Sequence, residues 1–143
     1  MATTTTFYNS YKKALFDKSI DHVNDTIKMA LVTSSYTPNY DSHDFFDDVT
    51  NEVSASGTYS AGGITLTSKT TSQDNTDNEG VFDSADPSVT SATITARGAV
   101  IYKSTGTAST SPLICYIDFG ENKSSASGTF GITFAAEGIV NVN

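Results

Sequence analysis

The hydrophobic residues of this chain occur in short runs, in which apolar side chains alternate with Thr and Ser or follow one another directly. Polar loops rich in Gly, Asn and Asp separate these runs, a pattern typical of β-strands. The sequence predicts strands at IKMALVTSS (27–35), ITLTS (64–68), VFD (81–83), TITARGAVIYK (93–103), LICYIDFG (113–120), SSASGTFGITF (124–134) and IVNVN (139–143). About seven short strands with polar connections predict an all-β fold, an antiparallel β-sandwich or barrel.

The two strongest strand signals lie in the second half of the chain. TITARGAVIYK is the longest, and Gly98 in its middle predicts a β-bulge. LICYIDFG is nearly continuously apolar, which predicts a central strand, and Cys115 within it is expected to be a buried apolar residue rather than a reactive thiol. Asp118 and Gly120 are expected to end this strand in a turn with Asn122.

Residues 1–24 have a different character, because a Thr run precedes aromatic and apolar residues at roughly helical spacing. The helically spaced residues are Phe7, Tyr8, Tyr11, Leu15 and Phe16. We expect the Thr run to be loose and the segment after it to form a short helix, or an arm that becomes ordered on a partner. The alternative is that residues 7–20 pack on their own sandwich. Residues 25–143 are expected to form a single β-sandwich domain.

The segment YTPNYDSHDFFDDVTNE (36–52), called here the acidic corner, combines five acids with one His and a Phe pair. Asp41 or Ser42 suits the N-cap of a short helix near residues 42–50, and acids in the first turn complement the positive end of a helix. Such a helix would turn one apolar face toward the core, formed by Phe45, Phe46 and Val49. Its outward side would carry the solvated acids Asp44, Asp47 and Asp48.

Two acidic patterns are candidates for metal binding. Asp44 and Asp48, one helical turn apart, could share a divalent ion. Further along the chain, residues at positions 1, 3, 5, 6 and 12 of a loop resemble a calcium-binding EF-hand, namely Asn75, Asp77, Glu79, Gly80 and Asp86. Because no helices are predicted around that loop, we expect a solvated β-loop and no metal, with Asp77, Glu79 and Asp86 as the only candidate ligands.

Composition supports the β prediction and narrows the function. Ser and Thr exceed a quarter of the chain and only 17% of residues are charged; Thr suits strands because its β-branched side chain fits a pleated surface. A net charge of −8 with scattered Lys and Arg argues against direct nucleic-acid binding. The chain has neither the features of a signal peptide nor an apolar stretch long enough to span a membrane, so we expect a protein that is made in the cytoplasm and stays soluble.

Sequence motifs of catalysis are missing as well. The chain contains no HExxH, no GxSxG and no glycine-rich phosphate loop. Its two histidines, His22 and His43, do not occur in a pattern typical of a nucleophilic triad. We therefore expect a protein that is not an enzyme and needs no cofactor.

Two paired blocks, SSYTPN…HDFFDDVTNEV and TARGAVIYK…SPLICYIDFG, carry a resemblance to a known family. Over residues 26–142 the chain resembles the head decoration, or capsid cement, proteins of tailed bacteriophages. The resemblance implies a β-sandwich or barrel and a binding function rather than catalysis. It also implies a virion location on the outer surface of the capsid, where the protein would bind the major capsid protein and stabilise contacts between capsomers.

The N-terminal segment is aromatic and locally basic on an otherwise acidic chain, which favours a role in contacts with the capsid or with a neighbouring subunit. The predicted contact residues are Phe7, Tyr8, Tyr11, Lys12, Lys13 and Phe16, together with the acids Asp44, Asp47 and Asp48. Copies of the chain are expected to assemble as a trimer or a dimer.

Two alternative functions remain open. One is a different virion component, such as a tail, neck or fibre-associated protein. The other is a carbohydrate-binding or hydrolytic β-domain that acts at the host surface. The chain has no Trp, which sugar-binding platforms often use, although its seven Tyr could substitute.

Overall fold

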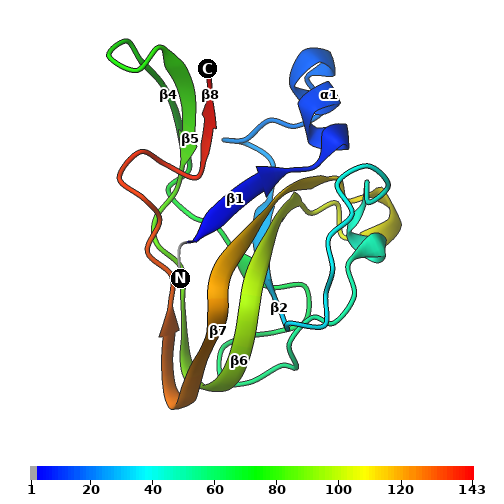
Figure 1. Cartoon of the computed structure of the whole chain (residues 1–143), viewed down its shortest axis with the longest axis vertical. Coiled ribbons are helices and arrows are strands. Elements are labelled where there is room, and N and C mark those ends of the chain that lie inside the picture. The colour runs from blue at the N-terminus through cyan, green and yellow to red at the C-terminus, as the bar shows by residue number, and fades with distance from the viewer. Residues whose placement is uncertain (1–2) are drawn as a thin grey trace.

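The computed structural model describes residues 3–143, which form two antiparallel sheets and one α-helix, α1 (Asn9–Asp17) (Figure 1). The larger sheet has the order β1-β7-β6-β2-β3, with strands β1 (Thr4–Phe7), β7 (Leu113–Gly131), β6 (Ser88–Lys103), β2 (Ile27–Val32) and β3 (Ile64–Thr65). The smaller sheet has the order β4-β5-β8, with strands β4 (Thr70–Asp74), β5 (Glu79–Asp83) and β8 (Val140–Val142). The predicted all-β sandwich is confirmed, with eight strands in the described residues.

The long strands β6 and β7 form the ribbon on which the larger sheet is built, and in Figure 1 this ribbon curves strongly at its lower end. The pairing register shifts between Ala96 and Gly98, where the sequence predicted a bulge, but the extra residues lie on the partner strand β7, between Asp118 and Lys123. Two serines in the curved part, Ser91 and Ser127, have φ values of 52° and 48°. The curvature therefore coincides with register shifts and left-handed backbone rather than with a break in the strands.

The turn predicted at Asp118, Gly120 and Asn122 is wrong, because β7 continues through these residues. The carboxylate of Asp118 accepts hydrogen bonds from the Gly120 N–H (2.8 Å) and from Arg97 Nε (2.8 Å). The residues that follow bulge away from β6, and the pairing resumes at Lys123. The turn-forming residues thus make a bulge inside one long strand.

Strands β1 and β4 were missed by the sequence pattern because both are polar. β1 has the sequence TTTF within the Thr run that was expected to be loose, and β4 has the sequence TTSQD. Both lie at the edge of a sheet. An edge strand with exposed side chains gains its order from backbone pairing, so it shows no apolar periodicity.

The N-terminal segment belongs to the sandwich and does not form a separate arm. β1 pairs with β7, and the side chains of Tyr11 and Ala14 on α1 are buried. Tyr8 is fully buried, with its hydroxyl 2.8 Å from that of Tyr36. The boundary predicted at residue 24 is therefore not a domain boundary; residues 1 and 2 of the predicted arm lie outside the described residues.

Apolar side chains pack on both faces of the larger sheet. The inner cluster, between the two sheets, includes Ile27, Met29, Leu31, Phe82, Ile101 and Ile114. The outer cluster includes Tyr8, Val32, Tyr36, Tyr102, Leu113 and Tyr116, against which Phe46 of the acidic corner packs. Burial on both faces explains why LICYIDFG is nearly continuously apolar. Cys115 is buried as a free thiol, as predicted.

The acidic corner contains a single 3-10 turn, η1 (Phe46–Asp48), which is shorter than the helix predicted near residues 42–50. Asp41 and Ser42 do not cap it. Their N–H groups instead donate hydrogen bonds to Oδ1 of Asn39, which organises the preceding turn.

The carboxylate of Asp48 closes the 3-10 turn, because Oδ2 accepts hydrogen bonds from the N–H groups of Asp44 (2.9 Å) and Phe45 (3.2 Å). Phe46 packs inward and stacks on Tyr102, with ring centroids 4.0 Å apart. The prediction that Phe45 faces the core is wrong, since this residue is 40% exposed. One inward ring and one capping carboxylate are enough to fix this corner on the outer cluster.

Candidate interaction surface

The structure divides the predicted N-terminal contact residues into a buried and an exposed set. Tyr8 and Tyr11 are buried, and Phe7 packs against the inner cluster. These three side chains hold the segment in its own sandwich, so their prediction as contacts with a partner is corrected. The exposed set consists of Lys12, Lys13 and Phe16.

The exposed side of α1 presents an apolar pair next to positive charge. Phe16 is 89% exposed and its neighbour Leu15 is 37% exposed. Residues 9–18 contain three lysines and one aspartate, a net charge of +2, in a chain of net charge −8. We call Lys12, Lys13, Leu15 and Phe16 the α1 surface. A Phe this exposed on an ordered helix contributes nothing to the core, which makes it a candidate for binding another protein.

The acidic corner lies beside α1 and extends this surface. Asn9 Nδ2 donates a hydrogen bond to Asp41 Oδ1 (2.7 Å). A groove of about 490 Å³ separates the helix from the corner, with Lys13 among its lining residues on one side and Asp44 and Phe45 on the other. The groove thus brings together Lys13 and Asp44, two residues that the sequence predicted as contacts. Asp17, which is paired with Lys13 at 2.6 Å, lines the helix side as well, whereas Lys12, Leu15 and Phe16 are not among the lining residues.

Among the predicted acids, Asp44 and Asp47 are exposed, and Asp48 is half-buried. The carboxylate of Asp48 accepts a hydrogen bond from the Asp44 N–H and so caps its own turn. This capping role explains the spacing of Asp44 and Asp48 without a bound metal ion. Of the three acids predicted as contacts in this corner, Asp44 and Asp47 are the ones whose side chains are exposed to a partner.

The calcium candidates are only partly brought together. Asp77 and Glu79 lie with Asp74 in a group whose oxygen atoms are within 4.8 Å of one another. Asp86 lies elsewhere and accepts a hydrogen bond from the Phe134 N–H (2.9 Å). The group occupies the exposed turn between β4 and β5, where Asp74 Oδ1 accepts N–H bonds that form this turn. The loop is a β-hairpin turn and not an EF-hand.

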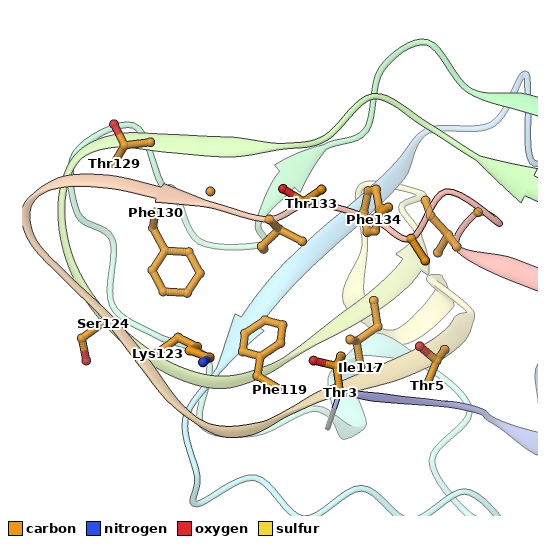
Figure 2. Close-up of a pocket in the computed structure, with 15 residues that line it drawn as sticks. Thr3, Thr5, Ile117, Phe119, Lys123, Ser124, Thr129, Phe130, Thr133 and Phe134 are labelled. Carbon is orange, nitrogen blue, oxygen red and sulfur yellow. The ribbon is translucent and has the colours of Figure 1, made fainter. Parts of the chain in front are cut away.

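A second groove, not foreseen from the sequence, opens between the larger sheet and the chain that follows β7. Figure 2 shows Phe119 and Ile117 on its floor, with Phe130 and Phe134 on the opposite wall. The rings of Phe119 and Phe130 are 6.4 Å apart, and the volume is about 600 Å³. We call this the phenylalanine groove. Ile117, Phe119 and Phe130 belong to the inner cluster and are only 6–8% exposed, and Phe134 packs against this cluster while remaining half-buried.

Both histidines are bound to tyrosines of the packed interior. Tyr36 hydroxyl lies 3.0 Å from His43 Nδ1, and Tyr11 hydroxyl lies 2.7 Å from His22 Nε2. The His22 ring also packs on Phe82, with centroids 5.0 Å apart. His22 therefore connects α1 to the smaller sheet.

The packed position of His22 predicts that the free energy of unfolding of the protein depends on pH. Burial lowers the pKa of His22, an effect that the nearby Asp21 and Asp25 carboxylates partly oppose. As the pH falls below about 6.5, the unfolded chain takes up a proton at His22 that the folded chain does not, so the free energy of unfolding decreases. We expect urea unfolding of the wild type to show this decrease between about pH 7 and pH 5, and His22→Gln to reduce it.

The carboxylates provide the control for this measurement. Hydrogen bonding from Arg97 lowers the pKa of Asp118, so its contribution to stability is lost only as the pH falls below about 4. Equal stability loss between pH 7 and pH 5 in wild type and His22→Gln would contradict the role given to His22.

Comparisons with models of known families, with curated proteins and with solved structures found no match for this chain. Within residues 3–143, no helix has the length and apolar character required to span a membrane.

Proposed function

We propose that this protein is a non-enzymatic structural protein of a tailed-bacteriophage virion that covers the outer surface of the capsid and stabilises contacts between capsomers. One observation carries the proposal: α1 and the acidic corner lie side by side on one exposed part of the surface, with the 89% exposed Phe16 and exposed lysines on the helix and the exposed carboxylates of Asp44 and Asp47 on the corner. Such a face is suited to binding other folded proteins through an apolar centre and a charged rim. The sequence blocks that resemble decoration proteins support the same proposal.

The acidic corner provides the most direct test. Replacing Asp44 and Asp47 together by lysine reverses two exposed charges and leaves the Asp48 cap in place, so the fold should be unchanged. The variant is expected to bind weakly to heads of the encoding phage that were assembled without this protein. Occupancy is measured by co-sedimentation and quantified on gels, and circular dichroism checks the fold. A charge-reversal control elsewhere on the surface is Asp77→Lys in the exposed β4–β5 turn, which matches each of the two single replacements in its change of charge.

Two results would contradict the proposal. Equal occupancy of the double variant and the control would remove the acidic corner from the interface. Electron microscopy of labelled virions is decisive for location, because a capsid protein covers the whole head, whereas label confined to the tail or neck would identify a different virion component.

A further inference from the structure

We infer that Phe16 of one copy inserts into the phenylalanine groove of a neighbouring copy, so that the protein associates with itself head to tail. This inference deepens the proposed function, because it names the partner of Phe16 and leaves the acidic corner for the surface that the copies cover. Its starting point is that one chain carries both an exposed aromatic side chain and an open aromatic groove.

The groove has the composition of a site for an aromatic side chain. Its lining includes Ile117, Phe119, Phe130, Phe134 and Ile139, and hydroxyl groups of Thr5 on β1 and of Thr3 just before this strand lie at one side (Figure 2). Its volume of about 600 Å³ leaves room for a Phe ring together with part of Leu15. Offset or tilted packing against two Phe rings is the arrangement that aromatic side chains favour.

The groove cannot be filled by Phe16 of the same copy. No residue of α1 is among those that line it. The helix follows the end of β1, whereas the groove is lined by Thr3 and Thr5 at the opposite end of that strand, and Figure 1 shows α1 projecting away from this region. The contact must therefore form between copies.

The charge distribution also favours contact between α1 of one copy and the phenylalanine groove of another. Residues 9–18 carry a net charge of +2, so the rest of the chain, which has −8 overall, carries −10. In the described residues, Lys12 and Lys18 on and after α1 take part in no ion pair. The same holds for Asp86, which accepts a hydrogen bond from the N–H of the lining residue Phe134, and for Glu137, which precedes the lining residue Gly138. Lys123, which also lines the groove, is neutralised by Glu121 at 2.6 Å. A basic helix end thus meets an acidic surface.

The contact joins two different patches and is therefore heterologous. Repetition of such a contact produces a closed ring when the rotation between copies closes, and an open chain when it does not. A two-fold dimer in which Phe16 meets Phe16 would instead be isologous and would leave the groove empty. The two arrangements respond differently to mutation.

Two variants separate them in sedimentation velocity, measured over a wide range of protein concentration. Phe16→Ser removes the inserted side chain and keeps the groove. Thr5→Arg keeps Phe16 and places a large cation in the groove, because Thr5 pairs with Ile117 and shares its face of the sheet. Each variant alone is expected to associate about 30-fold more weakly than wild type, as for loss of a buried aromatic hot spot. Their mixture should form a one-to-one dimer and nothing larger, since one functional contact remains.

Matched controls are Thr4→Arg, which puts the same side chain on the opposite face of β1, and Phe45→Ser, which removes another exposed Phe. Both should associate like wild type. The inference is overturned if wild type stays monomeric at all concentrations, if Thr5→Arg associates like wild type, or if the mixture of the two variants stays monomeric. Because no capsid is present, these outcomes are independent of the head-binding test of the proposed function.

Discussion

Replacing Tyr8 by alanine should lower the free energy of unfolding by about 3–5 kcal/mol, the cost typical of removing a large buried aromatic side chain. Tyr8 is fully buried, its ring lies 5.4 Å from that of Tyr40, and its hydroxyl is bound to Tyr36. The loss would therefore create a cavity and also leave the Tyr36 hydroxyl with one partner fewer. Chemical denaturation followed by circular dichroism measures the effect.

Two controls define what the Tyr8 result means. Tyr8→Phe keeps the ring and removes one hydrogen bond, so it should cost only about 1 kcal/mol. Phe16→Ala, on the exposed side of the helix, should leave stability nearly unchanged. If Tyr8→Ala were as stable as Phe16→Ala, the N-terminal segment would not be part of the folding unit. For the same reason, deletion of residues 1–20 is expected to unfold the sandwich, so it cannot be used to test a binding role of this segment.

Gly63→Ala is expected to cost about 2–4 kcal/mol, the sum of a left-handed backbone penalty and a steric clash. Gly63 has a φ of 93°, and a Cβ atom at this position would lie 2.1 Å from the carbonyl oxygen of Met29. The obstacle is backbone of β2 inside the larger sheet, so it cannot move aside as a flexible side chain would. β3 would have to separate from β2 to accommodate the methyl group.

Gly106→Ala is the matched control, because Gly106 has a similar φ of 89° but no atom within 4 Å of the added Cβ. Gly106→Ala should therefore lower the free energy of unfolding by the left-handed backbone penalty alone, about 1–2 kcal/mol. Thermal unfolding of both variants therefore isolates the clash. Equal melting temperatures would mean that the close approach of Gly63 to Met29 does not limit the fold.

The sequence determined the parts of the fold that depend on burying apolar side chains in strands. β2, β5 and β8 occur where alternating or continuous apolar runs predicted them, and the buried state of Cys115 follows from the same pattern. In these segments the apolar residues of the sequence are the ones that the folded strand buries, so the pattern predicts the strand directly. Asp44 and Asp47 are exposed, as predicted for the outward side of the acidic corner, whereas Asp48, predicted with them, is half-buried.

Tertiary structure alone decided the elements whose order comes from distant partners. The polar strands β1 and β4 form because a neighbouring strand supplies hydrogen bonds to their backbone. The local sequence of each strand does not indicate that this neighbour is present. The same holds for Asp118 and Gly120, which were expected to form a turn. Because β7 pairs with β6 on both sides of them, they form a bulge within β7 instead. In the acidic corner, packing of Phe46 on Tyr102 from β6 selected a 3-10 turn over a longer helix.

The candidate site shows the same division. Residue types in the N-terminal segment indicated aromatic and basic contacts, but only the packed structure shows that Tyr8 and Tyr11 face inward and Phe16 outward. The phenylalanine groove lies where the chain after β7 passes over the larger sheet: Ile117, Phe119 and Phe130 on its walls are only 6–8% exposed, whereas Phe134 is half-buried. A sequence specifies which side chains avoid water, whereas their final exposure depends on which distant segment reaches them, and that is fixed only when the whole chain has packed.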